Sequence, residues 1–244
     1  MNNTQLAGIT QKAKSQNPAT SEALKSQVKP IVSYSGTQQN ELLAALPRQD
    51  LEEMFDHLEL VAMPFGKELF EYGSKLEYVY FPTTAIVSLL YVMEDGATTE
   101  IAVVGHEGAV GVSLFMGERA TCSAVVQSAG YGYRLRTQYL RDAFNRGGAL
   151  PQLLMRYTNA LFAQMAQNAV GGRHSSIEQK LCRWLLDRLD RSASNELKVT
   201  QELISIMLGV RRESITAAAG KLQDEGLIQY RRGNITVLDR AGLE

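Results

Sequence analysis

Short apolar or alternating runs follow one another between residues 61 and 136, and Gly, Pro or Asp separates each run from the next. Their sequences are ELFEYG, EYVYFP, AIVSLLYVMEDG, TTEIAVVG, SAVVQSAG and YGYRLR. Runs of this length predict β-strands, and Asp95-Gly96 between two of them predicts a hairpin. Because the strands are several, short and regularly spaced, we expect a sandwich, a jelly roll or a barrel.

Helical spacing replaces this pattern on both sides of the strand-rich segment. Residues 41–60 predict short helices that Pro47 interrupts, and Asp50 is a candidate cap for the second of them. Residues 137–145 predict another helix, which ends near Gly147-Gly148.

The segment ALPQLLMRYTNALFAQMAQNAV predicts a longer helix with an apolar seam of the coiled-coil type. The seam residues, spaced by fours and threes, are Leu150, Leu154, Tyr157, Leu161, Met165 and Asn168, and the first five are the candidate dimer contacts. Leu153, Phe162 and Ala166 widen the stripe, so one face of the helix is free to pack on the chain's own domain. Gly171-Gly172 then predicts the end of the helix and a hinge.

The stretch SSIEQKLCRWLLDRL predicts an amphipathic helix at the start of a compact last unit. Ser175 and Glu178 have the spacing of a capping box. Trp184 lies on the apolar side of this helix, and we assign it to the core.

Residues 199–239 carry the most specific pattern in the sequence. TQELISIML predicts a short helix, Gly209 suits the positive φ of a tight turn, and RRESITAAAGKLQDEG predicts a second helix that Gly226 ends. LIQYRRGNITVL then predicts a hairpin with its turn at Gly233-Asn234. Helix, glycine turn, helix and hairpin make a winged helix-turn-helix.

The charged positions of this unit point to DNA as the partner. Arg bonds guanine O6 and N7 together and Glu accepts from cytosine N4, so Arg212 and Glu213 are candidates for base readout. Arg231 and Arg232 at the wing suit phosphates. The full set of candidate DNA contacts is Arg211, Arg212, Glu213, Ser214, Thr216, Ala217, Thr200, Gln201, Arg231 and Arg232. The alternative is a solvated charged face on a winged helix that binds another protein.

Net charge is nearly balanced, with 25 Lys and Arg against 26 Asp and Glu in 244 residues. This balance argues against a chain that coats nucleic acid as a polycation. The charge is uneven, however: residues 1–170 hold 13 basic and 16 acidic side chains, net −3, and residues 171–244 hold 12 and 10, net +2. A slightly basic end therefore coincides with the predicted DNA-binding unit.

The sequence lacks residues that several classes of protein require. No stretch reaches the roughly 18 consecutive apolar residues of a membrane span, and the start of the chain carries no hydrophobic signal segment. Cys122 and Cys182 are too few for a four-cysteine zinc or iron–sulfur site. His57, His106 and His174 are far apart in the sequence. We therefore expect no metal, no cofactor and no membrane partner, and a reducing cytoplasmic location.

A strand-rich N-terminal domain, a long seam helix and this C-terminal unit together resemble the Crp/Fnr superfamily of bacterial transcription regulators. The resemblance covers residues 41–240, and its most specific part is Arg212-Glu213-Ser214-Ile215, which matches the family's recognition helix. Ala217 departs from the family, in which many members carry Arg or Ser at this position. The resemblance implies a homodimer through the seam of the long helix and two recognition helices on a palindromic double-stranded DNA. RNA polymerase is a further candidate partner.

The resemblance also locates a candidate effector pocket. Cyclic-nucleotide-binding members have Gly-Glu-x-x-x-Leu followed by Arg-Ser/Thr-Ala, where Glu takes the ribose hydroxyl and Arg neutralises the cyclic phosphate. The matching residues here are Gly111, Val112, Ser113, Cys122 and Ser123. Val112 stands in place of the Glu and Cys122 in place of the Arg, while Arg119 is out of register and would point to the opposite face of a strand.

A buried phosphate without its charge partner loses a contact worth roughly 1.5–3 kcal/mol or more. We therefore expect cyclic AMP not to be the effector, and the effector is unknown. Two alternatives are a redox switch at Cys122 and a haem bound by His57, His106 or Cys122. A small buried thiol accounts for Cys122 more simply.

These patterns predict an α+β fold in four parts: a flexible N-terminal arm over 1–40, a jelly-roll (double-stranded β-helix) sensory domain over 41–146, a dimerisation helix over 147–170, and a winged helix-turn-helix over 171–244. The expected function is a homodimeric, sequence-specific transcription regulator that is not an enzyme. The main alternative is a small-molecule-binding β-roll protein whose winged helix mediates protein interaction. A β-barrel enzyme with an appended domain is the third, and it lacks a metal triad.

Overall fold

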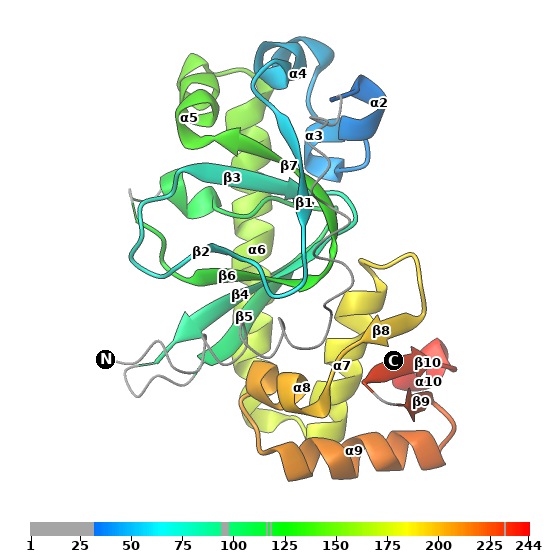
Figure 1. Ribbon diagram of the computed structural model, residues 1–244. Coiled ribbons are helices and arrows are strands. Elements are labelled where there is room, and N and C mark those ends of the chain that lie inside the picture. The colour runs from blue at the N-terminus through cyan, green and yellow to red at the C-terminus, as the bar shows by residue number, and fades with distance from the viewer. Residues whose placement is uncertain (1–31, 94–97, 116, 118, 232) are drawn as a thin grey trace.

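The computed structural model describes residues 32–93, 98–115, 117, 119–231 and 233–244. Figure 1 shows a β-rich domain at one end, a smaller helical domain at the other, and a long helix, α6, that extends along both. Asp95-Gly96 and Arg232 lie outside the described residues. The predicted mixed fold, a β domain followed by a helix-turn-helix domain, is confirmed.

Short helices precede, interrupt and follow the strands of the β domain. The helices are α2 (Tyr34–Thr37), α3 (Glu41–Ala44), α4 (Arg48–Phe55), the 3-10 helix η1 (Val112–Phe115) and α5 (Thr137–Arg146). The strands are β1 (Glu59–Met63), β2 (Glu68–Phe70), β3 (Tyr78–Pro82), β4 (Ile86–Val92), β5 (Thr98–Val104), β6 (Ser123–Ser128) and β7 (Gly130–Arg136). The expected break at Pro47 and the helix that follows the last strand of this domain are both present.

Two antiparallel sheets form the β domain, one with the strand order β1-β7-β3 and the other with the order β2-β6-β4-β5. Successive side chains of a strand point to opposite faces. Accordingly, Val79 and Phe81 of β3 pack against the surrounding helices, whereas Tyr80 packs against the second sheet. The apolar core of this domain therefore has two layers, one between the sheets and one beneath the helices.

The C-terminal domain packs helices on a small antiparallel sheet of order β8-β10-β9. The elements from the long helix onward are α6 (Ala149–His174), α7 (Ile177–Leu189), β8 (Glu196–Lys198), α8 (Gln201–Leu208), α9 (Arg212–Asp224), β9 (Ile228–Arg231), β10 (Asn234–Val237) and α10 (Arg240–Leu243). Trp184 is 4% exposed in this core, as expected. Leu90 and Val125 of the second β sheet belong to the same apolar cluster, so the two domains share a buried interface.

Residues 33–40 are not part of a flexible arm, contrary to the prediction. Ser33 caps α2, and Asn40 is fully buried. The Asn40 amide donates to the carbonyl oxygens of Pro82 and Gly108, both at 2.8 Å, and its Oδ1 caps α3. These partners are distant in sequence, so the polar composition of the segment gave no indication of them.

Helix α6 runs through Gly171-Gly172 to His174, so the predicted break there is wrong. A helix-interior glycine costs only about 1 kcal/mol relative to Ala, and a long packed helix tolerates that cost. The next cap is also shifted by one residue: Ser176 and Gln179, not Ser175 and Glu178, form the capping box of α7.

Two smaller predictions also need correction. Asp50 does not cap α4; its carboxylate accepts the backbone N–H of Ala149 at 3.3 Å, at the start of α6. Asn234 is not a turn residue, because it already pairs with Arg231 across the β9–β10 hairpin.

Candidate DNA interface, effector pocket and dimer face

The turn between α8 and α9 has the expected geometry. Thr200 caps α8 by accepting the N–H of Leu203 at 3.2 Å. Gly209 ends this helix in the left-handed conformation, with φ 62° and ψ 36°, and α9 begins three residues later. Glycine adopts this conformation without the steric cost that a Cβ brings. The glycine turn therefore sets the angle at which α9 leaves α8.

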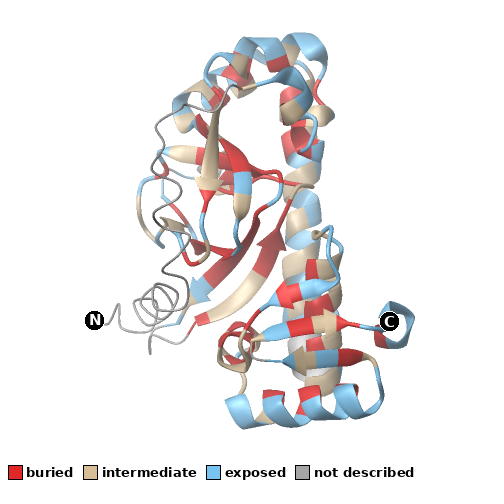
Figure 2. Ribbon diagram, turned by 45° about the vertical axis from the view of Figure 1, so that its right-hand side comes forward, coloured by how far each residue is buried: buried red, intermediate tan, exposed pale blue. Residues whose placement is uncertain are grey.

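Helix α9 buries one face and exposes the other. The buried face carries Ile215, Ala218, Ala219 and Leu222. The exposed side of the predicted contact set comprises Arg211, Arg212, Glu213, Thr216 and Ala217, with Ser214 half-buried beside them. Figure 2 shows this division along the helix, which forms the outer edge of the domain. The structure thus brings these six predicted residues onto one accessible surface.

Arg211 and Arg212 stand at the amino end of α9, where the helix dipole is positive. Within the described part of the chain, neither guanidinium group has an ion-pair partner, and the same holds for Arg231. Cations at this end of a helix gain nothing from the dipole. Both exposed side chains are therefore accessible to an anionic partner outside the chain.

Gln201 at the start of α8 is joined to the recognition surface. The hydroxyl of Thr216 donates to Gln201 Oε1 at 2.8 Å. Beside it, the N–H of Val199 donates to the carbonyl of Gly233 at 2.8 Å, so the wing turn lies next to Thr200. The fold therefore brings together three predicted segments: the start of α8, the first turns of α9 and the wing.

Lys198 is a candidate contact that the sequence reasoning missed. Asn234 on β10 pairs with Arg231 on one side and with Lys198 on the other. Directly paired residues project from the same face of a sheet, and all three are exposed. The pairing of β8 with the wing could not be seen without the fold, because the short ELK strand shows no pattern of its own. Arg232 lies outside the described residues.

Of the five predicted effector-pocket residues, Val112 lines the pocket described below, and the other four are not among its lining residues. Cys122 is 6% exposed in the apolar layer between the sheets, and burial raises the pKa of its thiol to about 11. Val112 belongs instead to the layer beneath the helices. Ser123 is buried, and its hydroxyl oxygen accepts the N–H of Tyr72 at 3.0 Å. Gly111 provides a turn with φ +102°, and Ser113 is half-buried.

Arg119 does not replace the missing arginine. Its Nη1 donates to the carbonyl of Gly73 at 2.7 Å, and the residue is exposed. The layer between the sheets is filled by apolar and aromatic side chains, among them Tyr80, and by Leu161 and Met165 of α6.

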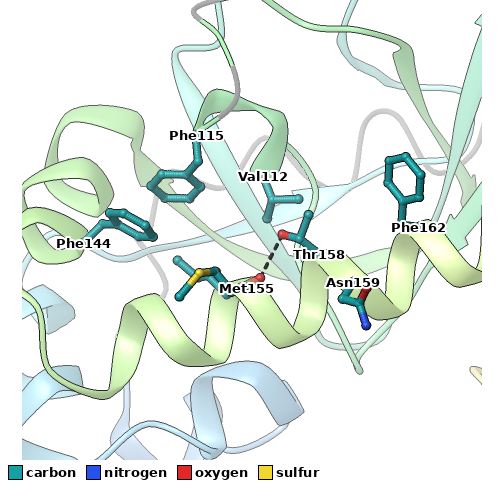
Figure 3. A pocket seen from close by; sticks show the side chains of 8 residues that line it. Val112, Phe115, Phe144, Met155, Thr158, Asn159 and Phe162 are labelled. Carbon is teal, nitrogen blue, oxygen red and sulfur yellow. Dashed lines mark hydrogen bonds between the residues drawn. The ribbon is translucent and has the colours of Figure 1, made fainter.

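A pocket of about 400 Å³ lies outside the β layers, between η1, α5 and α6. It is lined by Val112, Phe115, Phe144, Leu154, Met155, Thr158, Asn159 and Phe162. Figure 3 shows Phe115 and Phe144 side by side at one end and the α6 side chains along the floor; the two rings stack with centroids 4.5 Å apart. No lining residue is charged, so the pocket suits apolar groups.

The predicted dimer seam faces the chain's own β domain. Leu150 and Leu154 are 3% and 2% exposed in the core beneath the helices, and Tyr157 donates its hydroxyl to the carbonyl of Ala109 at 3.0 Å. Leu161 and Met165 pack against the layer between the sheets. Leu150 and Leu154 are therefore buried within the chain, while Tyr157, Leu161 and Met165 are half-buried and pack against the chain's own β domain.

The opposite face of α6 carries a second run with the same spacing. We call it the exposed stripe: Met155, Asn159, Phe162, Ala166 and Val170. Met155, Phe162 and Val170 are 59%, 66% and 64% exposed, values that are high for large apolar side chains. Three stripe residues, Met155, Asn159 and Phe162, also border the apolar pocket.

Among the described residues, no group of three or more His, Cys, Asp and Glu side chains is arranged to hold a metal ion. In the same part of the chain, no helix has the length and apolar character needed to cross a membrane.

Comparison with protein families gives two matches in chain order. Residues 61–146 match the cyclic nucleotide-binding domain, and residues 179–244 match the Crp-like helix-turn-helix domain. A curated relative, the global nitrogen regulator of Synechococcus elongatus, is 24% identical over 196 residues, which are 76% of this chain and 88% of that protein.

Solved structures share the fold. FixK2 from Bradyrhizobium japonicum superposes with a TM-score of 0.67 at 16% identity, over 76% of this chain and 95% of that one. A proposed transcriptional regulator of the Crp/Fnr family from Eubacterium rectale gives a TM-score of 0.66 at 17% identity, over 84% of this chain and 97% of that one.

Proposed function

Because the chain belongs to the Crp/Fnr superfamily of transcription regulators, we propose that it acts as a homodimer that binds a palindromic double-stranded DNA. The observation that carries the proposal is the recognition surface of α9, where Arg211 and Arg212 are exposed and have no ion-pair partner among the described residues. Such a surface, flanked by a basic wing, has the two contact points that a winged helix uses on DNA. The working compartment is then the cytoplasm, where the DNA is.

The roles of the residues differ in kind. Arg212 and Glu213 are the base-reading pair, since a guanidinium can bond guanine and a carboxylate can accept from cytosine. Arg231 and Lys198 hold the phosphate backbone beside the wing and fix the position of the domain on the duplex. Gln201 positions the recognition helix through its hydrogen bond with Thr216.

The exposed stripe of α6 is the proposed dimer face. Its spacing by fours and threes is that of a two-helix seam, and large apolar side chains left in water at both ends favour burial against a second copy. Phe162 and Met155 border the apolar pocket, so side chains of the second copy have a cavity to fill. A symmetric dimer places two α9 helices on half-sites about one helical turn apart and therefore favours an inverted repeat.

Selection of bound duplexes from a random pool tests this function. The protein should enrich inverted repeats, and the enriched duplex should lose affinity steeply as salt concentration rises, because bound phosphates release counterions. The Arg212→Ala variant should enrich less constrained sequences. Absence of any enriched sequence, with the protein folded, would contradict the proposal.

We propose further that cyclic AMP is not the effector. The carboxylate and guanidinium that bind its ribose and phosphate are replaced by Val112 and Cys122, which lie in different layers of the core. Arg119 is exposed and bonded to Gly73. A cyclic phosphate in this interior would remain without a charge partner.

Calorimetric titration with cyclic AMP should give no heat of specific binding at micromolar concentrations. The double variant Val112→Glu/Cys122→Arg carries the carboxylate and the guanidinium that the chain lacks, and its titration is compared with that of the unaltered chain. Saturable micromolar binding of cyclic AMP to the unaltered chain would contradict this part of the proposal.

A further inference from the structure

The C-terminal domain is held to the β domain by a buried ion pair between α7 and β5. Arg188 Nη2 lies 2.5 Å from Glu100 Oε2, and the two side chains are 4% and 7% exposed. Ser88 of β4 donates its hydroxyl to the same carboxylate oxygen. The guanidinium also covers the indole ring of Trp184 at 3.6 Å from the centroid and donates to its carbonyl at 3.2 Å. Every partner of Arg188 is thus fixed by one of the two domains.

A second arginine, three residues further along, repeats the arrangement at the edge of the interface. Arg191 Nε lies 2.6 Å from Glu107 Oε1, just beyond the end of β5. Gly105 makes this approach possible, because a Cβ there would lie 2.9 Å from Cβ and Cγ of Arg191. Two arginines of the C-terminal domain therefore meet two glutamates of the β domain.

Apolar contacts also join the two domains beside the inner pair, since Leu90 pairs with Glu100 between β4 and β5. Leu90 and Val125 of the β domain pack into the core of the C-terminal domain, and Gln127 Nε2 approaches Met207 Sδ of α8 at 3.7 Å. Charges buried in such a place are stabilised only while they are paired, and a displaced partner leaves the other charge desolvated and alone. The interface therefore favours one relative arrangement of the two domains, because other arrangements would separate the buried charges at a cost in free energy.

The covalent connection between the domains is short. Helix α6 ends at His174 and α7 begins at Ile177, so two serines join them. Helix α6 itself is fixed to the β domain, where Asn168 Nδ2 donates to the carbonyl of Ile101 at 3.2 Å. The angle between α6 and the recognition helix is thus set by the α6–α7 junction together with the docked interface.

We infer that Arg188 and Glu100 form a positioning pair, which fixes the separation of the two recognition helices in the dimer and so selects the spacing of the DNA half-sites. The inference rests on the proposed function. The pair does not touch DNA; it acts through the placement of α9 relative to the exposed stripe of α6. A dimer that lacks the pair still recognises each half-site, but no longer holds two of them at one distance.

The test uses the full chain with the substitutions Arg188→Met and Glu100→Gln, each of which removes one charge and keeps most of the side-chain volume. The double variant Arg188→Met/Glu100→Leu removes both charges and leaves no buried charge unpaired. Arg240→Met is the matched control, because Arg240 pairs with Asp190 on the surface of the same domain. Affinity is measured on the selected palindrome, on a single half-site, and on the palindrome with one base pair inserted at its centre.

Each single variant should bind the palindrome about 10-fold more weakly, with half-site affinity within about twofold of the unaltered chain. The penalty for the inserted base pair should shrink in the double variant, and the control should match the unaltered chain on all three duplexes. Equal losses on palindrome and half-site, or an unchanged insertion penalty in the double variant, would overturn the inference. If a single variant does not fold, the result for the double variant tests the inference.

Trp184 gives a readout that needs no DNA, because it is the only tryptophan of the chain and lies against Arg188. Opening of the interface should shift its emission to longer wavelength in both single variants and leave it unchanged in Arg240→Met. Unchanged emission in both single variants would overturn the positioning role even if no palindrome were selected. Failure of the unaltered chain to select any duplex, with the emission shift present, would refute the proposed function instead.

Discussion

Two arginines at the amino end of α9, Arg211 and Arg212, have no ion-pair partner within the described part of the chain. Arg212 is exposed and stands where the helix dipole is positive, so its charge costs local stability. The proposed DNA partner would supply negative charge and hydrogen-bond acceptors at this place. Arg231 at the wing is also exposed, but its neighbours are on strands, and its proposed partner is a phosphate.

Substituting Arg212 and substituting Arg231 should therefore weaken DNA binding in different ways. Arg212→Ala should weaken binding to the selected duplex by roughly 1–3 kcal/mol and relax preference at one base pair of each half-site. Arg231→Ala should weaken binding to all duplexes alike and reduce the salt slope by about one. Fluorescence anisotropy on the selected duplex, its single-base variants and a random duplex measures both effects. Equal weakening on every duplex by Arg212→Ala would contradict base readout.

Cys122 should be chemically inert in the folded chain. Burial raises the pKa of its thiol from 9.0 to about 11, so the thiolate is scarcer than in an ordinary cysteine by about 100-fold at neutral pH. Alkylation by iodoacetamide should be slow, should speed up about tenfold per pH unit below 11, and should become fast on denaturation. Mass spectrometry of the labelled chain measures the rate. Rapid native labelling at pH 7 would restore the redox-switch hypothesis.

At the level of elements, α6 shows how far a periodic pattern can be trusted. Leu150, Leu154 and Tyr157 have the spacing of a seam, and so do Met155, Asn159 and Phe162 on the opposite side. Spacing identifies the helix but does not say which face meets the chain's own domain. That choice depends on the apolar layers of the β domain, which are assembled from strands distant in sequence.

Local features of the C-terminal unit were predicted more accurately. Gly209, Gly226 and the exposed first turn of α9 are decided by residues that neighbour one another, and the structure has all three as expected. The Arg188–Glu100 pair joins residues 88 positions apart, and Lys198 joins the wing through a strand of three residues. Neither contact can be predicted from the residues that neighbour it in the sequence.

The dimer face is tested by placing a charge in the exposed stripe. Phe162→Glu should convert the dimer to a monomer with an unchanged circular-dichroism spectrum, because the side chain is already 66% exposed within one chain. Gln167→Glu is the matched control, since Gln167 is exposed on α6 outside the stripe. Sedimentation equilibrium measures the mass. A dimer that survives Phe162→Glu would place the interface elsewhere on the molecule.

At the scale of the whole molecule, the nearly neutral chain is an average of unlike parts. The β domain and α6 pack together through a shared apolar core and leave the exposed stripe on α6, and the C-terminal domain carries the proposed recognition surface. A buried interface with an ion pair joins them, and the exposed stripe lies on α6, which extends along both. The proposed binding of DNA by two chains would therefore depend on contacts at three separate places.

The stoichiometry of the complex tests the central claim most directly. Native mass spectrometry of the chain with the selected palindromic duplex should show two chains per duplex, and Phe162→Glu should show single-chain complexes at the same protein concentration. One chain per duplex for the unaltered protein, or no complex with any selected duplex, would contradict a dimeric DNA-binding regulator.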